Sequence, residues 1–246
     1  MSDDQTPAPS DDEMAAVATD GPPRTPPARH DPAVTEQESQ SRAAVYRTGR
    51  LEAFSDGVFA IAITLLILEI AVPAGSGDDL LGALGDLWPS YLAYLVSFST
   101  IGAVWFGHTV ITEYLDHADS VLVRLNLLLL LLVSFLPFPT KLLAEYTGEV
   151  EAERVAATAY GINLLLAMVM VSVLWRYAVH EQLVRPDLAD DDVKTLTKRL
   201  TPTLGIYVAM IVVGLFVPVV AVLGYLALAI FILVPFSALR HHRSQT

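Results

Sequence analysis

The chain has 246 residues, a formal net charge of −12, 53% hydrophobic residues and only 17% charged residues. Ordinary soluble domains have about 25% charged residues, so this composition indicates a protein of the lipid bilayer. The absence of cysteine excludes disulfide scaffolds, thiolate metal sites and cysteine nucleophiles, and the negative charge argues against a nucleic-acid partner.

The first 44 residues differ in composition from the rest of the chain. Seven of the fifteen prolines precede Arg50, together with many Asp, Glu, Ser and Thr and almost no large apolar residue. Such a segment buries too little apolar surface to offset the entropy lost on ordering. We therefore predict a disordered, acidic and proline-rich cytoplasmic tail over residues 1–44 and a membrane domain over 45–243.

Long segments without Asp, Glu, Lys or Arg dominate the membrane domain. A helix that spans a bilayer needs about 20 mostly apolar residues. The 40 uncharged residues between Arg199 and Arg240 are enough for two such helices, so we expect a hairpin near Val217–Gly224. We predict an all-α membrane protein with six transmembrane helices per chain, at about 50–72, 87–111, 122–144, 153–176, 200–218 and 221–240.

The first of these helices has the shortest uncharged core. Gly57–Leu68 contains only twelve residues without charge. A helix with polar groups so close to the middle of the bilayer needs shielding by protein or water. We therefore expect this helix to lie inside the assembly and not at its rim.

The distribution of basic residues predicts the orientation. With both termini in the cytoplasm, thirteen of the fifteen Lys and Arg residues fall on the cytoplasmic side, where membrane proteins concentrate them. The outer connections keep only Lys141 and Arg154 and carry acidic residues such as Asp78 and Asp79. We predict a multi-pass protein of the cell membrane with both termini cytoplasmic.

Several polar residues are expected at one depth near the cytoplasmic side. Ser55 and Asp56 begin the first helix, Trp105 and His108 lie near the end of the second, and Asn126 lies near the start of the third. Indole, imidazole and amide groups need hydrogen-bond partners in a dry environment, which favours a network between helices. The alternative for each residue is local packing, or helix capping for Ser55 and Asp56.

The core of the first helix carries a stripe of aliphatic side chains that includes one polar residue, Thr64. Ile61, Thr64, Leu65 and Leu68 follow the i, i+3, i+4, i+7 spacing of one helical face. A stripe like this is more often a packing surface than a pore lining, and Thr64 can bond to a carbonyl of its own helix.

These motifs together resemble a known family. Arg50, Phe54-Ser55-Asp56-Gly57, Trp105-x-x-His108, Asn126 and Phe135-Leu-Pro137-Phe-Pro139-Thr140 are similar to the lysosomal potassium channels called transmembrane protein 175, in their prokaryotic six-span branch. The resemblance covers about residues 45–240. It implies a homotetramer around a central pore lined by the first helix. It also implies conduction of potassium with leakage of other monovalent cations, and no cofactor besides the permeant ion.

The resemblance further implies roles for individual residues. Ile61 forms the hydrophobic constriction, Leu68 a second apolar ring and Thr64 a polar layer, in place of the carbonyl selectivity filter of ordinary potassium channels. A narrow ring of Ile61 side chains excludes water and so gates by dewetting. Apart from the resemblance, acidic residues such as Glu69, Asp78 and Asp79 would raise the cation concentration at the outer mouth. Glu69 departs from the family, in which a less acidic residue is expected at this position. The first helix is held by an anchoring network of Arg50, Phe54, Ser55, Asp56, Trp105, His108 and Asn126.

Two other functions are compatible with a membrane protein of this kind. A secondary transporter of a small cation or solute is the main alternative, although the two halves of the chain show no repeat of the type that transporters usually contain. An intramembrane hydrolase using Ser55 and His108 would lack the Gly-x-Ser-x-Gly elbow. We therefore predict a protein that is not an enzyme and holds no metal site, with copies of itself, membrane lipid and potassium ions as its partners.

Overall fold

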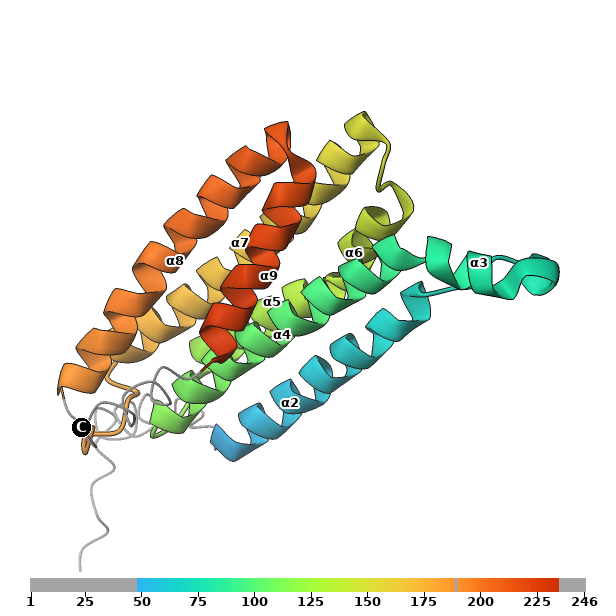
Figure 1. The fold of residues 1–246 in the computed structure, drawn as a ribbon. Coiled ribbons are helices and arrows are strands. Elements are labelled where there is room, and N and C mark those ends of the chain that lie inside the picture. Colours follow the sequence, from blue (N-terminus) through green and yellow to red (C-terminus); the bar gives the residue numbers. More distant parts are fainter. Residues whose placement is uncertain (1–47, 189, 235–246) are drawn as a thin grey trace, which may run out of the picture. The chain divides into compact units, whose positions relative to one another are not determined.

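The computed structural model describes residues 48–188 and 190–234, which belong to one compact unit. The predicted tail of residues 1–44 and the end of the predicted sixth span lie outside the described residues. The described chain is helical, which confirms the all-α class (Figure 1). Its helices are α2 (Thr48–Leu65), η1 (Leu66–Glu69), η2 (Ser76–Asp79), α3 (Leu80–Asp86), α4 (Trp88–Tyr114), α5 (Ser120–Phe135), α6 (Pro137–Glu145), α7 (Val150–His180), α8 (Asp190–Phe216) and α9 (Pro218–Leu233).

Five helical segments within the described residues are long and apolar enough to cross a bilayer. These segments are Thr48–Glu69, Trp88–Tyr114, Ser120–Glu145, Val150–His180 and Val193–Phe216. The sixth predicted span corresponds to α9, which is apolar but has only 16 residues. The hairpin expected near Val217–Gly224 is confirmed, because α8 ends at Phe216 and α9 begins at Pro218.

Helix α8 begins earlier than predicted. It starts at Asp190 instead of residue 200, so that Lys194 and Lys198 belong to its first turns. These turns pack on the end of α7, where the indole Nε1 of Trp175 donates to Thr197 Oγ1 over 2.8 Å. The charged connector is thus a helical extension that is fixed to its neighbour.

The first span is shorter than the predicted range 50–72. The α-helix ends at Leu65, a 3₁₀ turn continues to Glu69, and residues 70–72 are not helical. Pro73 disfavours a helical conformation in the residue before it, which explains why the helix cannot reach residue 72. The short first span therefore finishes in a tight turn, closed by the Ile70 amide donating to the Ile67 carbonyl at 3.2 Å.

The third predicted span consists of two helices that meet at Pro137. Proline has no N–H to donate to the Val133 carbonyl, and the Leu136 amide bonds to that carbonyl instead, at 3.2 Å. The Leu132 carbonyl is thereby released, and Asn163 Nδ2 of α7 donates to it at 3.1 Å. Because a side chain from another helix satisfies this carbonyl, the break is tolerated at membrane depth.

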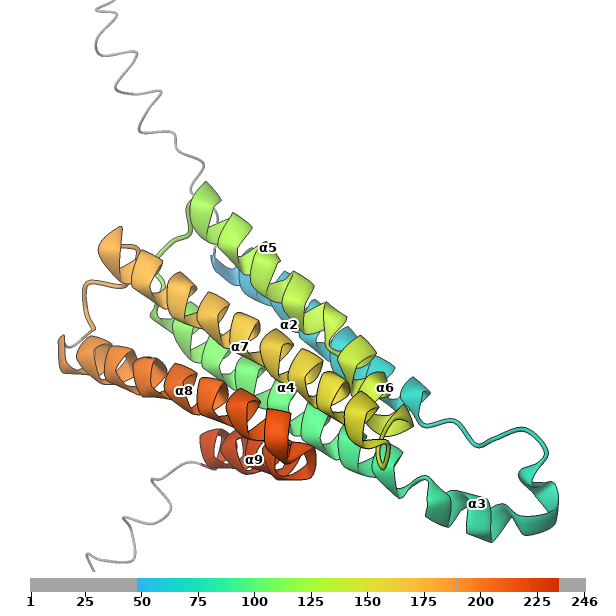
Figure 2. The same cartoon turned by 90° about the horizontal axis from the view of Figure 1, so that it is seen from above.

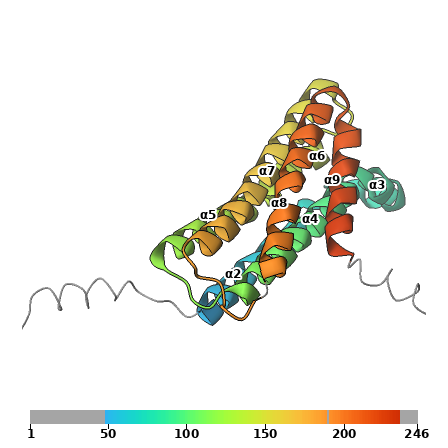
Figure 3. The same ribbon diagram turned by 90° about the vertical axis from the view of Figure 1, so that its left-hand side faces the viewer.

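The helices differ strongly in how far the rest of the chain covers them. Of the most apolar stretch of α7, 56% is buried, against 22% for the first span. Helix α7 contacts α5, α6 and α8, whereas α2 packs on α4 and α5 (Figure 2). Helix α9 lies against α4 and α8 (Figure 3). The first span is therefore a helix at one edge of the chain's own bundle.

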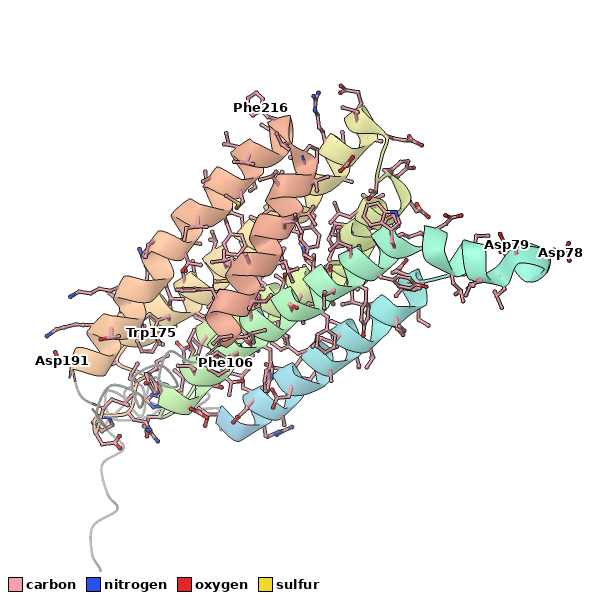
Figure 4. All side chains as sticks on the ribbon, viewed as in Figure 1. Asp78, Asp79, Phe106, Trp175, Asp191 and Phe216 are labelled. Carbon is pink, nitrogen blue, oxygen red and sulfur yellow. The ribbon has the colours of Figure 1, made fainter. Side chains whose placement is uncertain are left out.

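Charged connections lie at both ends of the bundle. We call these the Thr48 end and the Glu69 end, after the residues where the first span begins and finishes. Asp78 and Asp79 lie at the tip of the hairpin that η2 and α3 form at the Glu69 end, and Asp191 lies at the other end (Figure 4). At the Thr48 end, two connections pair through their backbones, with Asp116 N donating to Leu183 O at 2.9 Å.

Candidate functional site

Helix α2 and η1 have one buried face and one exposed face. Ser55, Phe59, Ala62 and Leu66 follow at intervals of four, three and four residues and are almost completely buried. The side chains of Phe54, Ile61 and Leu68 are 56%, 60% and 70% exposed. Thr64 shares the exposed face, and its Oγ1 donates to the Ile61 carbonyl at 2.9 Å. The stripe noted in the sequence is thus turned away from the chain's own core.

A chain of hydrogen bonds joins the buried face of α2 to two other helices. Asn126 Nδ2 of α5 donates to Ser55 Oγ at 2.9 Å, and Ser55 Oγ donates to the Leu51 carbonyl at 2.8 Å. Asn126 Oδ1 lies 2.8 Å from His108 Nε2 of α4. Ser55, His108 and Asn126 are all buried, so these bonds replace hydration that the bilayer interior cannot supply.

The position of the imidazole proton follows from the partners of Asn126. The amide nitrogen of Asn126 is used by Ser55, so its oxygen acts as an acceptor and His108 Nε2 is the donor. His108 Nδ1 is buried and has no hydrogen-bond partner among the residues described. The ring of Phe59 packs against the imidazole with 5.5 Å between ring centroids. His108 is therefore held by α5 on one side and by α2 on the other.

A second bond links α2 to α4 next to the first. Trp105 Nε1 donates to Asp56 Oδ1 over 2.8 Å. Asp56 follows Ser55 directly and so lies about 100° further around the helix, which directs its carboxylate to α4 while Ser55 faces α5. Two adjacent residues thus connect α2 to two different helices.

The structure brings together five of the seven residues predicted for the anchoring network. Ser55, Asp56, Trp105, His108 and Asn126 are connected by the bonds above, whereas Arg50 and Phe54 are exposed and lie outside these bonds. Phe59 was missed by the sequence analysis. Its spacing of four residues from Ser55 was the available signal, because it places both on the same helical face.

The same geometry bears on the hydrolase and metal alternatives. The Ser55 hydroxyl donates to a backbone carbonyl, and His108 bonds Asn126, so the two form no nucleophile and base pair. Within residues 48–188 and 190–234, no three His, Asp or Glu side chains are grouped so that they could hold a metal ion. The arrangement instead fixes the rotation of α2 against α4 and α5.

Comparison with known proteins identifies the family. The family model described as endosomal/lysosomal potassium channel TMEM175 matches residues 50–137, a range that includes α2 from Arg50 onward, α4, α5 and all five connected residues. A protein of Chamaesiphon minutus named a potassium channel is 47% identical over 165 residues, which are 65% of this chain and 80% of that protein. The chain belongs to the TMEM175 family.

Other TMEM175 relatives agree with this assignment. The crystal structure of a lysosomal potassium-selective channel TMEM175 homolog from Chamaesiphon minutus matches with a TM-score of 0.69 and 40% identity, covering 78% of this chain and 97% of that one. A potassium channel of Streptomyces collinus is 50% identical over 129 residues, 52% of this chain and 63% of its own length, slightly under two thirds. TMEM175 proteins are channels and not enzymes, which excludes the hydrolase.

Proposed function

We propose that this TMEM175 chain is a potassium channel, leaky to other monovalent cations, in which four copies surround a pore lined by the exposed face of α2 and η1. The observation that carries the proposal is the two-sided first span. Its buried face is bonded to α4 and α5, and its opposite face presents Ile61, Thr64 and Leu68 outside the chain. The potassium-channel names of the bacterial relatives support the choice of ion.

Small residues beside this stripe favour close approach of neighbouring copies. Ala53, Gly57, Ala60 and Thr64 are all exposed and follow each other at intervals of four, three and four residues. In membranes, small side chains on one helical face allow helix backbones to pack closely. A ring of four first spans therefore brings the larger side chains of Phe54, Ile61 and Leu68 near a common axis.

The pore that results has an apolar neck. The Ile61 side chains form the narrowest ring and exclude water, so an ion must lose hydration to pass. Leu68 forms a second apolar ring, and the Thr64 hydroxyls supply a polar layer between them. Selectivity then arises without a filter of backbone carbonyls.

The hydrogen bonds of Ser55 and Asp56 set which residues face the axis. A helix with free rotation would present different side chains to the pore, and the bonds to Trp105 and Asn126 remove that freedom. Arg50 and Phe54 lie near the start of the same helix but outside these bonds, so their part in the anchoring stays a prediction. Glu69, Asp78 and Asp79 raise the local cation concentration at the outer mouth. The proposed channel lies in the cell membrane, with six spans and both termini cytoplasmic.

Substitution of Ile61 tests the neck. We expect Ile61→Ala and Ile61→Asn to raise potassium flux into liposomes at least about tenfold, which corresponds to roughly 1.4 kcal/mol removed from the barrier. The matched control is Val212→Ala, because Val212 is an aliphatic residue that is 50% exposed and lies on α8, a helix that carries none of the proposed pore residues. Single-channel recording gives conductance and cation preference for the same variants.

Two results would contradict the proposal. Unchanged flux and unchanged cation preference in both Ile61 variants would show that this face does not line the pathway. Saturable, coupled uptake without single-channel steps would instead favour the secondary transporter.

A further inference from the structure

A second group of buried hydroxyls lies apart from the bonds that hold α2. It consists of Ser97 and Thr100 on α4, Thr140 on α6 and Tyr160 on α7, each at most 1% exposed. Ser97 Oγ lies 2.7 Å from Thr140 Oγ1 and 3.2 Å from the Tyr160 hydroxyl, which lies 3.4 Å from Thr100 Oγ1. We call these four residues the hydroxyl junction; it joins three helices at one point.

Every hydroxyl of the junction has an acceptor for its proton. Thr140 donates to the Leu136 carbonyl at 2.8 Å, Ser97 donates to Thr140 or Tyr160, and Tyr160 donates to Thr100. Thr100 Oγ1 then donates to the Val96 carbonyl at 2.6 Å, where the chain of donors ends. Removing the Tyr160 or Thr140 hydroxyl therefore removes hydrogen bonds between helices that water does not replace in a dry environment.

The junction fixes a short helix that touches the end of the first span. Helix α6 has nine residues and is separated from α5 by the break at Pro137, so α5 does not dictate its direction. Both α6 and α4 contact η1, where Leu66 is completely buried. The placement of η1 therefore depends on where the junction holds α6 against α4.

We propose that the hydroxyl junction is a second positioning site for the pore helix, acting through α6 on η1 and thereby on the ring formed by Leu68. Thr140 and Tyr160 are positioning residues that do not themselves face the permeant ion. The inference rests on the proposed function for its effect on flux, but its effect on the position of η1 is independent of that function. The bonds of Ser55 and Asp56 hold the Thr48 end of the helix, and the junction holds the Glu69 end.

The experiment uses the natural absence of cysteine. Leu68→Cys and Ile61→Cys each place a single thiol on the full-length chain for a nitroxide spin label, whose spectrum reports local motion. Into each labelled protein we introduce Tyr160→Phe or Thr140→Val, which remove a hydroxyl and keep the shape. We expect greater mobility of the label at position 68 and no change at position 61. In unlabelled protein, we expect potassium flux to change about fivefold. This is the change in an equilibrium constant that the loss of one buried hydrogen bond typically causes.

Two control variants separate positioning from general loss of packing. Tyr225 is also completely buried, but its hydroxyl has no hydrogen-bond partner within the described residues, so Tyr225→Phe should change neither label nor flux. Thr140→Ser keeps the hydroxyl and should behave like the parent protein. Equal label responses in Tyr160→Phe and Tyr225→Phe, or an unchanged label at position 68 in Tyr160→Phe, would overturn the inference. Unchanged flux in Ile61→Ala would overturn the proposed function, while the label spectra would still decide the role of the junction.

Discussion

Asn126 is the residue on which the bonds around α2 converge. Its amide nitrogen donates to Ser55 and its oxygen accepts from His108, so one side chain serves partners on two other helices. All three residues are buried, and the bilayer interior contains no water that could replace a lost hydrogen-bond partner. Removing Asn126 therefore affects two buried polar groups at once, whereas removing Trp105 affects a single bond at a side chain that is 40% exposed.

Asn126→Ala should lower the free energy of unfolding by about 2 kcal/mol, since leaving a buried donor or acceptor unsatisfied costs roughly 1–3 kcal/mol. Trp105→Phe should have a smaller effect. Thermal unfolding of the purified protein in detergent measures both. Ser134→Ala is the control on the same helix, because within the described residues Ser134 Oγ bonds only to the Leu131 carbonyl of α5, at 3.0 Å. A melting temperature for Asn126→Ala equal to that of Ser134→Ala would contradict the role given to Asn126.

The sequence predicts which residues share this depth, but not which atoms meet. Topology and charge place Ser55, His108 and Asn126 near one side of the membrane, and buried polar groups need partners, so a network is a physical expectation. The pairing of Asn126 with both neighbours depends on the rotation of each helix about its axis, which the packing of all helices decides. Phe59 lacks a polar atom, and nothing in its type distinguishes it from other apolar residues of the first span.

At the scale of elements, helix existence is easier to predict than helix ends. Uncharged segments of bilayer length predict α4 and α7 because charge is costly in hydrocarbon. The break at Pro218 is also predictable, since 40 uncharged residues are too many for one span. The break at Pro137 is different, because the predicted span 122–144 has the length of a single transmembrane helix. The side chain that makes this break tolerable, Asn163, lies on another helix.

The link between Asn163 and Pro137 can be tested with a double-mutant cycle. Asn163→Leu leaves the Leu132 carbonyl without its donor and should cost about 1–2 kcal/mol of stability. Pro137→Ala restores an N–H for the Val133 carbonyl, which returns the Leu136 amide to Leu132. Asn163→Leu should therefore cost less in the Pro137→Ala background, as measured by thermal unfolding. Additive effects of the two substitutions would contradict a shared role at the break.

At the scale of the whole molecule, the helix that carries the candidate pore residues is poorly covered by its own chain. Within the described residues, α4 and α5 pack on α2, and α4 and α6 pack on η1, while the face with Ile61 and Leu68 is left open. The same helix has the shortest uncharged core, which suits contact with protein and water better than contact with lipid. In the proposed tetramer, other copies of the chain supply such contacts symmetrically.

Cross-linking between copies tests this arrangement directly. Ile61→Cys introduces a single thiol into a chain without cysteine, and a disulfide requires two Cα atoms within about 7 Å of each other. If four first spans surround an axis with Ile61 at the narrowest point, mild oxidation should link Ile61→Cys chains into pairs on a denaturing gel, and native mass spectrometry should show four chains. Val212→Cys, on an equally open face of α8, should remain unlinked because it faces lipid in that assembly. Equal linking of both variants, or a monomer in the native spectrum, would place Ile61 away from any symmetry axis and remove the basis for a pore.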